Sequence, residues 1–221
     1  MNSPQSRRFM ARARGPLACF TRPEMKVERV SYEVMTPSAA RGILEAVLWK
    51  PAIAWRIHEI AVLNPIAWAS FRRNEVNSRQ RPGGGDYFAD EDRAQRNTVA
   101  LKDVDYIITA SFVLTERMGP ADNMLKFEEM FERRLEKGQC FSQPYLGCRE
   151  FAADVTTAPQ EYTPHQPGVD RPLGLMFYDF DFQAGGVRPC FFEARLRHGV
   201  LHVPPWHEVM GLTKQEVGVQ P

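Results

Sequence analysis

Several features that mark metal proteins and secreted proteins are missing from this sequence. Its 221 residues include only four cysteines. No two of them form a C-x-x-C pair, and no histidine stands beside them at zinc-finger spacing. We therefore expect free, buried thiols and no structural metal. Asp179 and Asp181 alternate along one predicted strand without a further acid or histidine. A metal-dependent nuclease is thus the least favoured enzyme class.

Long hydrophobic runs are also missing. No apolar stretch approaches the roughly 20 residues that a membrane span requires. Residues 1–14 contain four arginines but no apolar segment after them, so we do not expect a signal peptide. We expect a cytoplasmic protein without a membrane partner.

The charge is nearly balanced overall but unevenly distributed. The formal net charge is only +1, yet residues 1–56 contain ten basic and four acidic side chains. A basic patch on one side of the molecule could bind phosphate groups although the whole chain is close to neutral.

The strongest local signal is a helix between Thr36 and Pro51. Thr36 suits the N-cap, and Pro37 suits the first helical position, where its missing N–H costs nothing. Apolar residues recur from Ala40 to Leu48 at helical spacing, and Pro51 ends the helix. Trp49 follows the apolar stripe and gives the helix an aromatic edge.

The other periodic segments complete one recognisable order of elements. We expect a flexible tail over residues 1–15, then strands at 16–20, 53–62, 66–76 and 98–114, a helix at 120–137 and a strand at 148–153. The strand at 98–114 is either continuous or interrupted at Lys102 and Asp103. This order is typical of the split βαβ arrangement. We therefore predict an α+β protein whose residues 16–154 form a ferredoxin-like, RRM-related βαββαβ domain.

The composition changes after Asp154. Four prolines punctuate a loop, and three short apolar segments follow at 173–182, 191–196 and 200–203. We expect residues 155–221 to form a β-rich C-terminal region, with these segments as a small antiparallel appendage.

Several motifs, in this order, resemble one known family. They are F-T-R-P-E-M-K-V-E-R-V-S-Y at 20–32, T-P-S-A-A-R-G-I-L-E-A at 36–46, W-K-P-A-I at 49–53, R-R-N-E-V at 72–76, R-N-T at 96–98, G-Q-C-F at 138–141 and Y-L-G-C-R-E-F at 145–151. Together they are similar to the Dvulg-type (subtype I-C) CRISPR-associated endoribonucleases of the RAMP superfamily.

This resemblance implies a function in CRISPR antiviral defence. Members of the family bind the stem-loop repeats of precursor CRISPR RNA and cut at the 3′ base of the stem without a metal or other cofactor. They then stay on the repeat-derived handle as a subunit of Cascade. The implied partners are CRISPR repeat RNA and other Cascade subunits, and DNA bound without sequence preference is a further candidate.

The family's catalytic residues are only partly present. Metal-free cleavage needs a base for the 2′-OH, an acid for the leaving oxygen and a cation for the phosphorane. The family has a tyrosine on the first helix and an adjacent lysine–histidine pair on the second. The matching positions here are Leu48, Lys126 and Phe127, so only the lysine is retained.

Two interpretations remain open, and a third comes from a different class. Cleavage could continue with Lys126 as the phosphate cation and His58 and Tyr32 as substitute proton donors and acceptors. Alternatively, the chain binds the handle without cutting it. A protein that only contacts other subunits is the third candidate. The plainer interpretation is a solvent-facing strand residue for His58 and a structural aromatic for Tyr32.

Seven basic residues are candidates for RNA phosphate contacts or for stacking on unpaired bases. They are Arg22, Lys26, Arg29, Arg72, Arg73, Arg96 and Arg149. Arg72 and Arg73 face opposite sides of a predicted strand, so the more buried of the two needs an acidic or polar partner. Arg149 lies in an expected apolar strand, where the same argument applies. We expect Arg72, Arg73, Arg149 and Lys126 to share one cationic surface.

Overall fold

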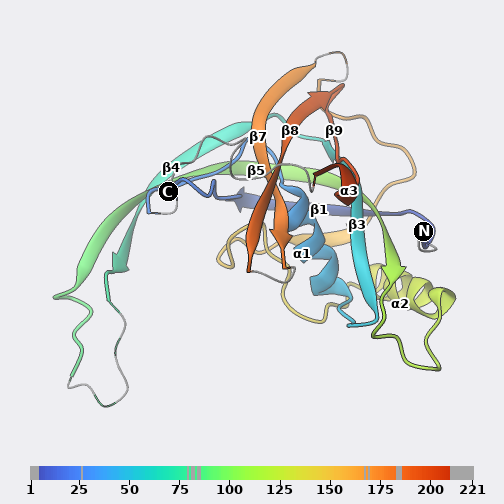
Figure 1. The fold of residues 1–221 in the computed structure, drawn as a ribbon. Coiled ribbons are helices and arrows are strands. Elements are labelled where there is room, and N and C mark those ends of the chain that lie inside the picture. Colours follow the sequence, from blue (N-terminus) through green and yellow to red (C-terminus); the bar gives the residue numbers. More distant parts are fainter. Residues whose placement is uncertain are drawn as a thin grey trace.

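The computed structural model confirms an α+β protein built on one mostly antiparallel sheet (Figure 1). It describes residues 5–25, 27–78, 80, 83, 86–166, 168, 170–182 and 186–209. The elements are β1 Phe9–Ala18, β2 Arg29–Val30, α1 Pro37–Val47, β3 Ile53–Val62, β4 Ala67–Val76, β5 Arg93–Leu114, α2 Met124–Glu136, β6 Asp154–Thr157, β7 Arg171–Asp181, β8 Arg188–Arg197, β9 Val200–His202 and α3 Trp206–Val209. The strand order is β6-β1-β5-β3-β9-β8-β7, and β2 and β4 also pair with β5.

Strand β5 is the longest element and joins two parts of the molecule. Its second half pairs with β1 and β3, whereas its first half pairs with β4 and β2. Between the halves, Asp103 has a φ of +52°. β4 and the first half of β5 curve away from the body as a two-stranded arm (Figure 1). The strand is thus continuous, and it begins five residues before the predicted start at 98.

Both long helices begin at side-chain caps. In α1 the Thr36 hydroxyl accepts a hydrogen bond from the Ala39 N–H at 3.3 Å, and the helix ends before Pro51 as predicted. In α2 the Asn123 side chain accepts from the Lys126 N–H at 2.9 Å, so this helix begins four residues later than predicted. Among the described residues, no helix is long and apolar enough to cross a membrane.

An aromatic cluster forms the centre of the core. Trp55 of β3 packs against Phe131 of α2, with 4.7 Å between ring centroids, and against Phe112 of β5, with 5.4 Å. Phe9 of β1 packs edge-on against Phe131 at 5.2 Å. Fully burying side chains of this size contributes about 1.5–3 kcal/mol each. The cluster therefore holds α2 on the sheet.

The C-terminal strands continue the same sheet. β7, β8 and β9 include the three predicted segments, and β9 pairs with β3 along Glu59–Ala61. β7 is also tied to α1, because Arg41 donates two hydrogen bonds to the carboxylate of Asp179, at 2.7 and 3.0 Å. The predicted strands are thus confirmed, and backbone pairing attaches them to the main sheet.

Two local predictions were wrong. Residues 9–15 were assigned to a flexible tail but belong to β1, which pairs with β5 and β6. Phe9, Ala11 and Ala13 point into the core, while arginines on the other face make the segment look like a solvated tail. Residues 148–153 form a loop with an isolated bridge between Tyr145 and Ala152, and the strand beside β1 is β6. Lys26 and the extreme ends 1–4 and 210–221 lie outside the described residues.

The loop before β6 packs tightly against the end of β1. The Cys19 N–H donates to the Leu146 carbonyl at 3.0 Å, and Gly147 has a φ of +84°. A Cβ on Gly147 would overlap the carbonyl of Cys19. Gly147 therefore allows this close approach of two backbones.

We expect Gly147→Ala to lower the free energy of unfolding by at least about 2 kcal/mol, because it adds both overlap and a left-handed alanine. Gly42→Ala is the matched control. Gly42 lies within α1 with no atom near its missing Cβ, so alanine there should stabilise by about 0.5–1 kcal/mol. Urea unfolding of both variants tests the pair, and equal effects would contradict the prediction.

Candidate nucleic-acid interface

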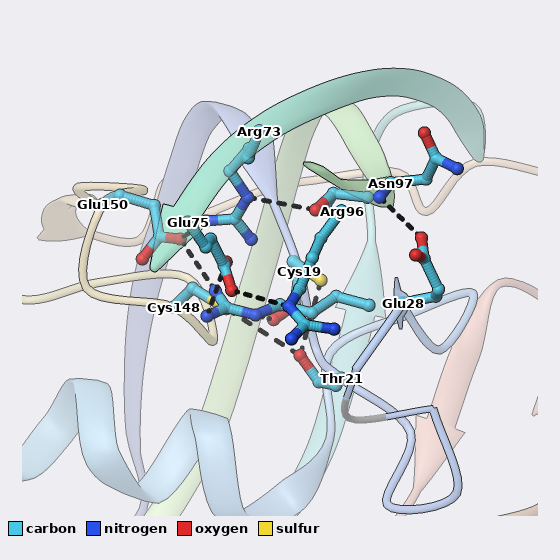
Figure 2. A network of polar contacts seen from close by, with 11 residues as sticks. Cys19, Thr21, Glu28, Arg73, Glu75, Arg96, Asn97, Cys148 and Glu150 are labelled. Carbon is cyan, nitrogen blue, oxygen red and sulfur yellow. Dashed lines mark hydrogen bonds and ion pairs between the residues drawn. The ribbon is translucent and has the colours of Figure 1, made fainter. Parts of the chain in front are cut away.

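Three of the predicted arginines gather where the arm joins the body. They are Arg29 on β2, Arg73 on β4 and Arg96 on β5. Glu75 pairs with Arg29 at 3.4 Å and with Arg96 at 3.5 Å. Glu150, from the loop before β6, pairs with Arg29 at 3.0 Å. Figure 2 shows these acids between the arginine-bearing strands and the loop. We call these five residues the arm-base cluster.

Arg73 is the most enclosed cation of the cluster. Its Nη1 donates to Glu150, and its Nε donates to the Thr98 hydroxyl at 3.1 Å (Figure 2). Its side chain is 20% exposed, and its Nη2 is buried without a hydrogen-bond partner among the described residues. The predicted partner for the more buried of Arg72 and Arg73 is therefore confirmed, and it comes from a loop distant in sequence.

Glu150 is ionised in this setting. Burial alone would raise its pKa, but hydrogen bonds from its own N–H and from Arg73, with the charges of Arg73 and Arg29, lower the pKa overall. The Glu150 carboxylate therefore forms ion pairs with two guanidinium groups and holds the loop before β6 against the arm.

A thiol pair borders the same cluster. Cys148 lies 3.8 Å from Arg29 Nη1, and both Cys148 and Cys19 contact the Thr21 hydroxyl, at 3.8 and 3.5 Å. The Cys148 thiol donates to the Cys19 carbonyl at 3.5 Å. The neighbouring Cys19 thiol lowers the pKa of Cys148, and the charge of Arg29 acts in the same direction. The pKa of Cys19 is raised, first by the neighbouring Cys148 thiol and then by burial. Cys148 is thus the thiol of the pair that ionises more readily.

The other predicted RNA contacts have separate surroundings. Arg72 lies on the face of β4 opposite Arg73 and donates to Gln95 at 3.2 Å. Arg22 covers the ring of Tyr32, with 4.6 Å from its guanidinium carbon to the ring centroid. Arg149 is exposed in the loop before β6 rather than in an apolar strand. Arg149 shares this loop with Glu150 of the arm-base cluster. Arg72 points away from the cluster.

The three catalytic candidates also have separate partners. Lys126, in the first turn of α2, donates to Asp122 at 2.9 Å. His58 sits at a bulge in β3, with 2.7 Å between its Nε2 and the Ser111 hydroxyl. The buried Tyr32 hydroxyl accepts from the Phe177 N–H at 3.1 Å. α2 and the arm lie on opposite sides of the molecule in Figure 1, so Lys126 does not share a surface with Arg73.

Burial shifts the pKa of two of these candidates. It raises the pKa of Tyr32, so its hydroxyl stays protonated. It lowers the pKa of His58, and the charge of Arg8 acts in the same direction. His58 is therefore neutral at neutral pH and can accept a proton, whereas Tyr32 anchors β7 to the segment before α1.

Comparison with known proteins identifies the family. A family model described as CRISPR-associated protein (Cas_Cas5), named Cas_Cas5d, matches residues 10–204. The CRISPR pre-crRNA endoribonuclease Cas5d of Mannheimia succiniciproducens is 47% identical over 211 residues, covering 87% of this chain and 93% of the relative. The chain belongs to the Cas5d family. The protein of the same name from Thermus thermophilus is 41% identical over 215 residues, covering 89% and 91%.

A solved structure agrees with this membership. The crystal structure of a CRISPR-associated protein superposes on this Cas5d chain with a TM-score of 0.74 and 25% identity, covering 95% of this chain and 97% of that one. The α+β fold is therefore shared along nearly the whole length.

In this Cas5d chain, the two replaced family positions belong to the core. Leu48 caps the C-terminus of α1 and is 0% exposed, and Phe127 of α2 is 2% exposed. Lys126, one residue before Phe127, points outward and its Nζ lies 5.7 Å from the Phe127 ring centroid. Both replacements are thus packed as the apolar stripes predict.

Sequence reasoning missed the acids and thiols of the arm base. Glu75 alternates with Arg73 along β4, a signal that places both on one face. No sequence signal relates Glu150 to Arg73, or Cys148 to Cys19, because these pairs are 77 and 129 residues apart.

We expect Cys148 to react with iodoacetamide at lower pH than Cys140. The thiolate is the nucleophile, and the pKa of Cys148 is lowered, whereas burial raises the pKa of Cys140. The pH midpoint of alkylation, followed for each peptide by mass spectrometry, should therefore lie lower for Cys148. Cys19→Ala removes the neighbouring thiol and should raise the Cys148 midpoint. Equal midpoints for Cys148 and Cys140 would contradict the assignment.

Proposed function

We propose that this Cas5d protein acts in CRISPR antiviral defence, binds the stem-loop repeats of precursor CRISPR RNA and stays with the repeat-derived handle in Cascade. The observation that carries the proposal is 41–47% identity, over nearly the whole chain, to two proteins named CRISPR pre-crRNA endoribonuclease. Its expected location is the cytoplasm, and its expected partners are repeat RNA and the other Cascade subunits.

We infer further that β6-β1-β5-β3 is the four-stranded sheet of a ferredoxin-like unit. The supporting features are its antiparallel strand pairs and the order of its elements, with α1 between β1 and β3 and α2 between β5 and β6. β4 and the first half of β5 are then an insertion between the second and third strands of this unit. RRM-related sheets commonly present RNA-binding groups, which agrees with the proposed ligand.

The charges around the arm suggest two roles for the predicted arginines. Glu75, Glu150 and the readily ionised Cys148 offset the charges of Arg29, Arg73 and Arg96. In the described part of the chain, no acid pairs with Arg72 or Arg149. We infer that Arg72 and Arg149 meet RNA phosphates, whereas the paired arginines hold the arm in position.

We expect Arg72→Glu to weaken binding of a repeat hairpin. The slope of log affinity against log salt concentration should fall by about the contribution of one phosphate contact. Unfolding should be unaffected, because Arg72 is exposed and, in the described part of the chain, bonds Gln95.

Arg73→Gln should have the opposite effect, on unfolding rather than on RNA affinity. It leaves a polar cluster incomplete and should lower the free energy of unfolding by about 1–3 kcal/mol. A filter-binding salt titration and a thermal melt separate the two effects, and unchanged affinity for Arg72→Glu would remove it from the RNA surface.

We propose that cleavage, where it occurs, uses Lys126 and His58. The ammonium of Lys126 lies outside the core and would stabilise the negative phosphorane, and the neutral His58 would accept the 2′-OH proton. As the P–O5′ bond breaks and the 2′,3′-cyclic phosphate forms, the protonated His58 would pass that proton to the leaving 5′-oxygen. Tyr32 is the weakest of the three candidates, because its hydroxyl is buried and already bonded to Phe177. A handle-binding subunit that does not cut is the second candidate function. The burial of Leu48 and Phe127 favours it, since neither side chain can transfer a proton.

Incubation of the protein with repeat RNA in EDTA distinguishes the two candidates. For a nuclease we expect product in EDTA, a loss of at least about tenfold with Lys126→Ala, and loss with His58→Ala. If His58 is the base, the rate should rise with pH through a midpoint below 6.5 and then level off, because the pKa of His58 is lowered. Tight binding without product at any pH would support the non-cleaving subunit, and duplex DNA as competitor tests the DNA prediction.

A further inference from the structure

Trp49 and Phe141 form a stacked aromatic pair on the protein surface. Their ring centroids are 5.8 Å apart with an interplanar angle of 27°, and the residues are 49% and 60% exposed. Trp49 follows the C-cap of α1, and Phe141 follows the turn that ends α2. No element described above buries the pair, and neither the fold nor the catalytic proposal uses it.

We propose that Trp49 and Phe141 are a stacking platform for an unpaired base of the repeat RNA, beside Lys50. This inference rests on the proposed RNA-binding function and names the chemistry of one part of that site. Stacking of a base on an aromatic ring is tolerant of base identity, because every base has a π-face.

The backbone around the platform is held firmly. The Phe141 and Ser142 N–H groups donate to the Ala46 carbonyl, at 2.7 and 3.1 Å. Arg134 Nη1 donates to the Val47 carbonyl at 2.8 Å. These bonds satisfy carbonyls at the end of α1 that lack partners within the helix. The two rings are therefore presented by a capped helix end, and little ordering is needed on binding.

The surrounding charges favour a nucleic acid over an apolar protein segment. Lys50 follows Trp49, and Arg134 reaches the end of α1 from the last turn of α2. Lys126 and Lys50 both act on Asp122, since a hydrogen bond from Lys126, its charge and the charge of Lys50 lower the pKa of Asp122. Lys50 and Arg134 thus place cations beside an exposed π-surface, which is the combination that binds single-stranded RNA.

The position also suits the substrate. Lys50 follows Trp49, and its charge lowers the pKa of Asp122, the carboxylate that pairs with Lys126. A repeat cut at the base of its stem has unpaired nucleotides next to the duplex. A base from that segment could stack on Trp49 while its phosphate meets Lys50.

A fluorescent base analogue tests the platform. A repeat hairpin with 2-aminopurine in the unpaired segment beside the stem is titrated with the full-length protein. Affinity and quenching of the analogue are both recorded. Trp49→Ala and Phe141→Ala should each weaken binding roughly tenfold, within the range of one lost base stack, and should reduce quenching. Trp49→Phe keeps an aromatic face and should retain most of both signals.

Phe182→Ala is the matched control, because Phe182 is 71% exposed, follows β7 and packs on Phe180 rather than on Trp49 or Phe141. It should bind as the wild type does. Thermal melts check that the variants fold, as expected for exposed side chains.

The outcomes separate the two proposals. Wild-type affinity and quenching in Trp49→Ala and Phe141→Ala overturn the platform and leave the proposed function intact. An equal loss of affinity with Phe182→Ala also overturns the platform. If Trp49→Ala and Phe141→Ala bind RNA normally but no longer co-elute with Cascade subunits, the pair contacts a protein partner and the platform is again overturned. A wild-type protein that does not prefer the hairpin to a scrambled RNA overturns both.

Discussion

The hydrogen bonds along β5 are the constraint on which the rest of the structure depends. One strand is paired on both sides in its second half, between β1 and β3, and carries the arm with its first half. The arm's own residues alternate between half-buried and exposed, and on the half-buried face Phe71 packs on Phe151 and Arg73 pairs with Glu150. The direction of the arm is therefore set by backbone pairing, by the positive φ at Asp103 and by these contacts with the loop before β6. The position of any ligand group bound to the arm therefore depends on the central sheet.

The pairing of arginines with acids then determines which cations near the arm are left for a ligand. A guanidinium group that loses water needs anions or hydrogen-bond acceptors nearby, because an unpaired buried charge is costly. At the arm base, two carboxylates and a readily ionised thiol meet this requirement for Arg29, Arg73 and Arg96. The charges of these three arginines are thus offset, whereas in the described part of the chain no acid pairs with Arg149 or with Arg72, which points away from the cluster. A basic N-terminal region in the sequence overstated the positive charge that the folded surface presents.

The parts of the fold that were predictable are those with local causes. The cap at Thr36, the stop at Pro51 and the alternation from Ile53 to Val62 depend on neighbouring residues, and the structure has them as expected. The first seven residues of β1 were missed because small alanines and outward arginines give them a weak apolar signal. The arm-base cluster was missed for another reason, since its members come from β2, β4, β5 and a distant loop. Strand order, and not spacing, brings them together.

Burial of the two replaced family positions explains how binding and cleavage can separate in this chain. Leu48 and Phe127 lie between the helices and the sheet, so a tyrosine or histidine packed there would need a hydrogen-bond partner or would cost about 1–3 kcal/mol. Successive residues of a helix point about 100° apart. Lys126 therefore stays outside when Phe127 joins the core, and its ammonium remains available to a phosphate. Surface cations can persist after proton-transfer positions become apolar, because the cations face solvent whereas the apolar positions pack in the core. The fold thus has apolar core residues at these two positions, while Lys126 keeps its charge at the surface beside Asp122.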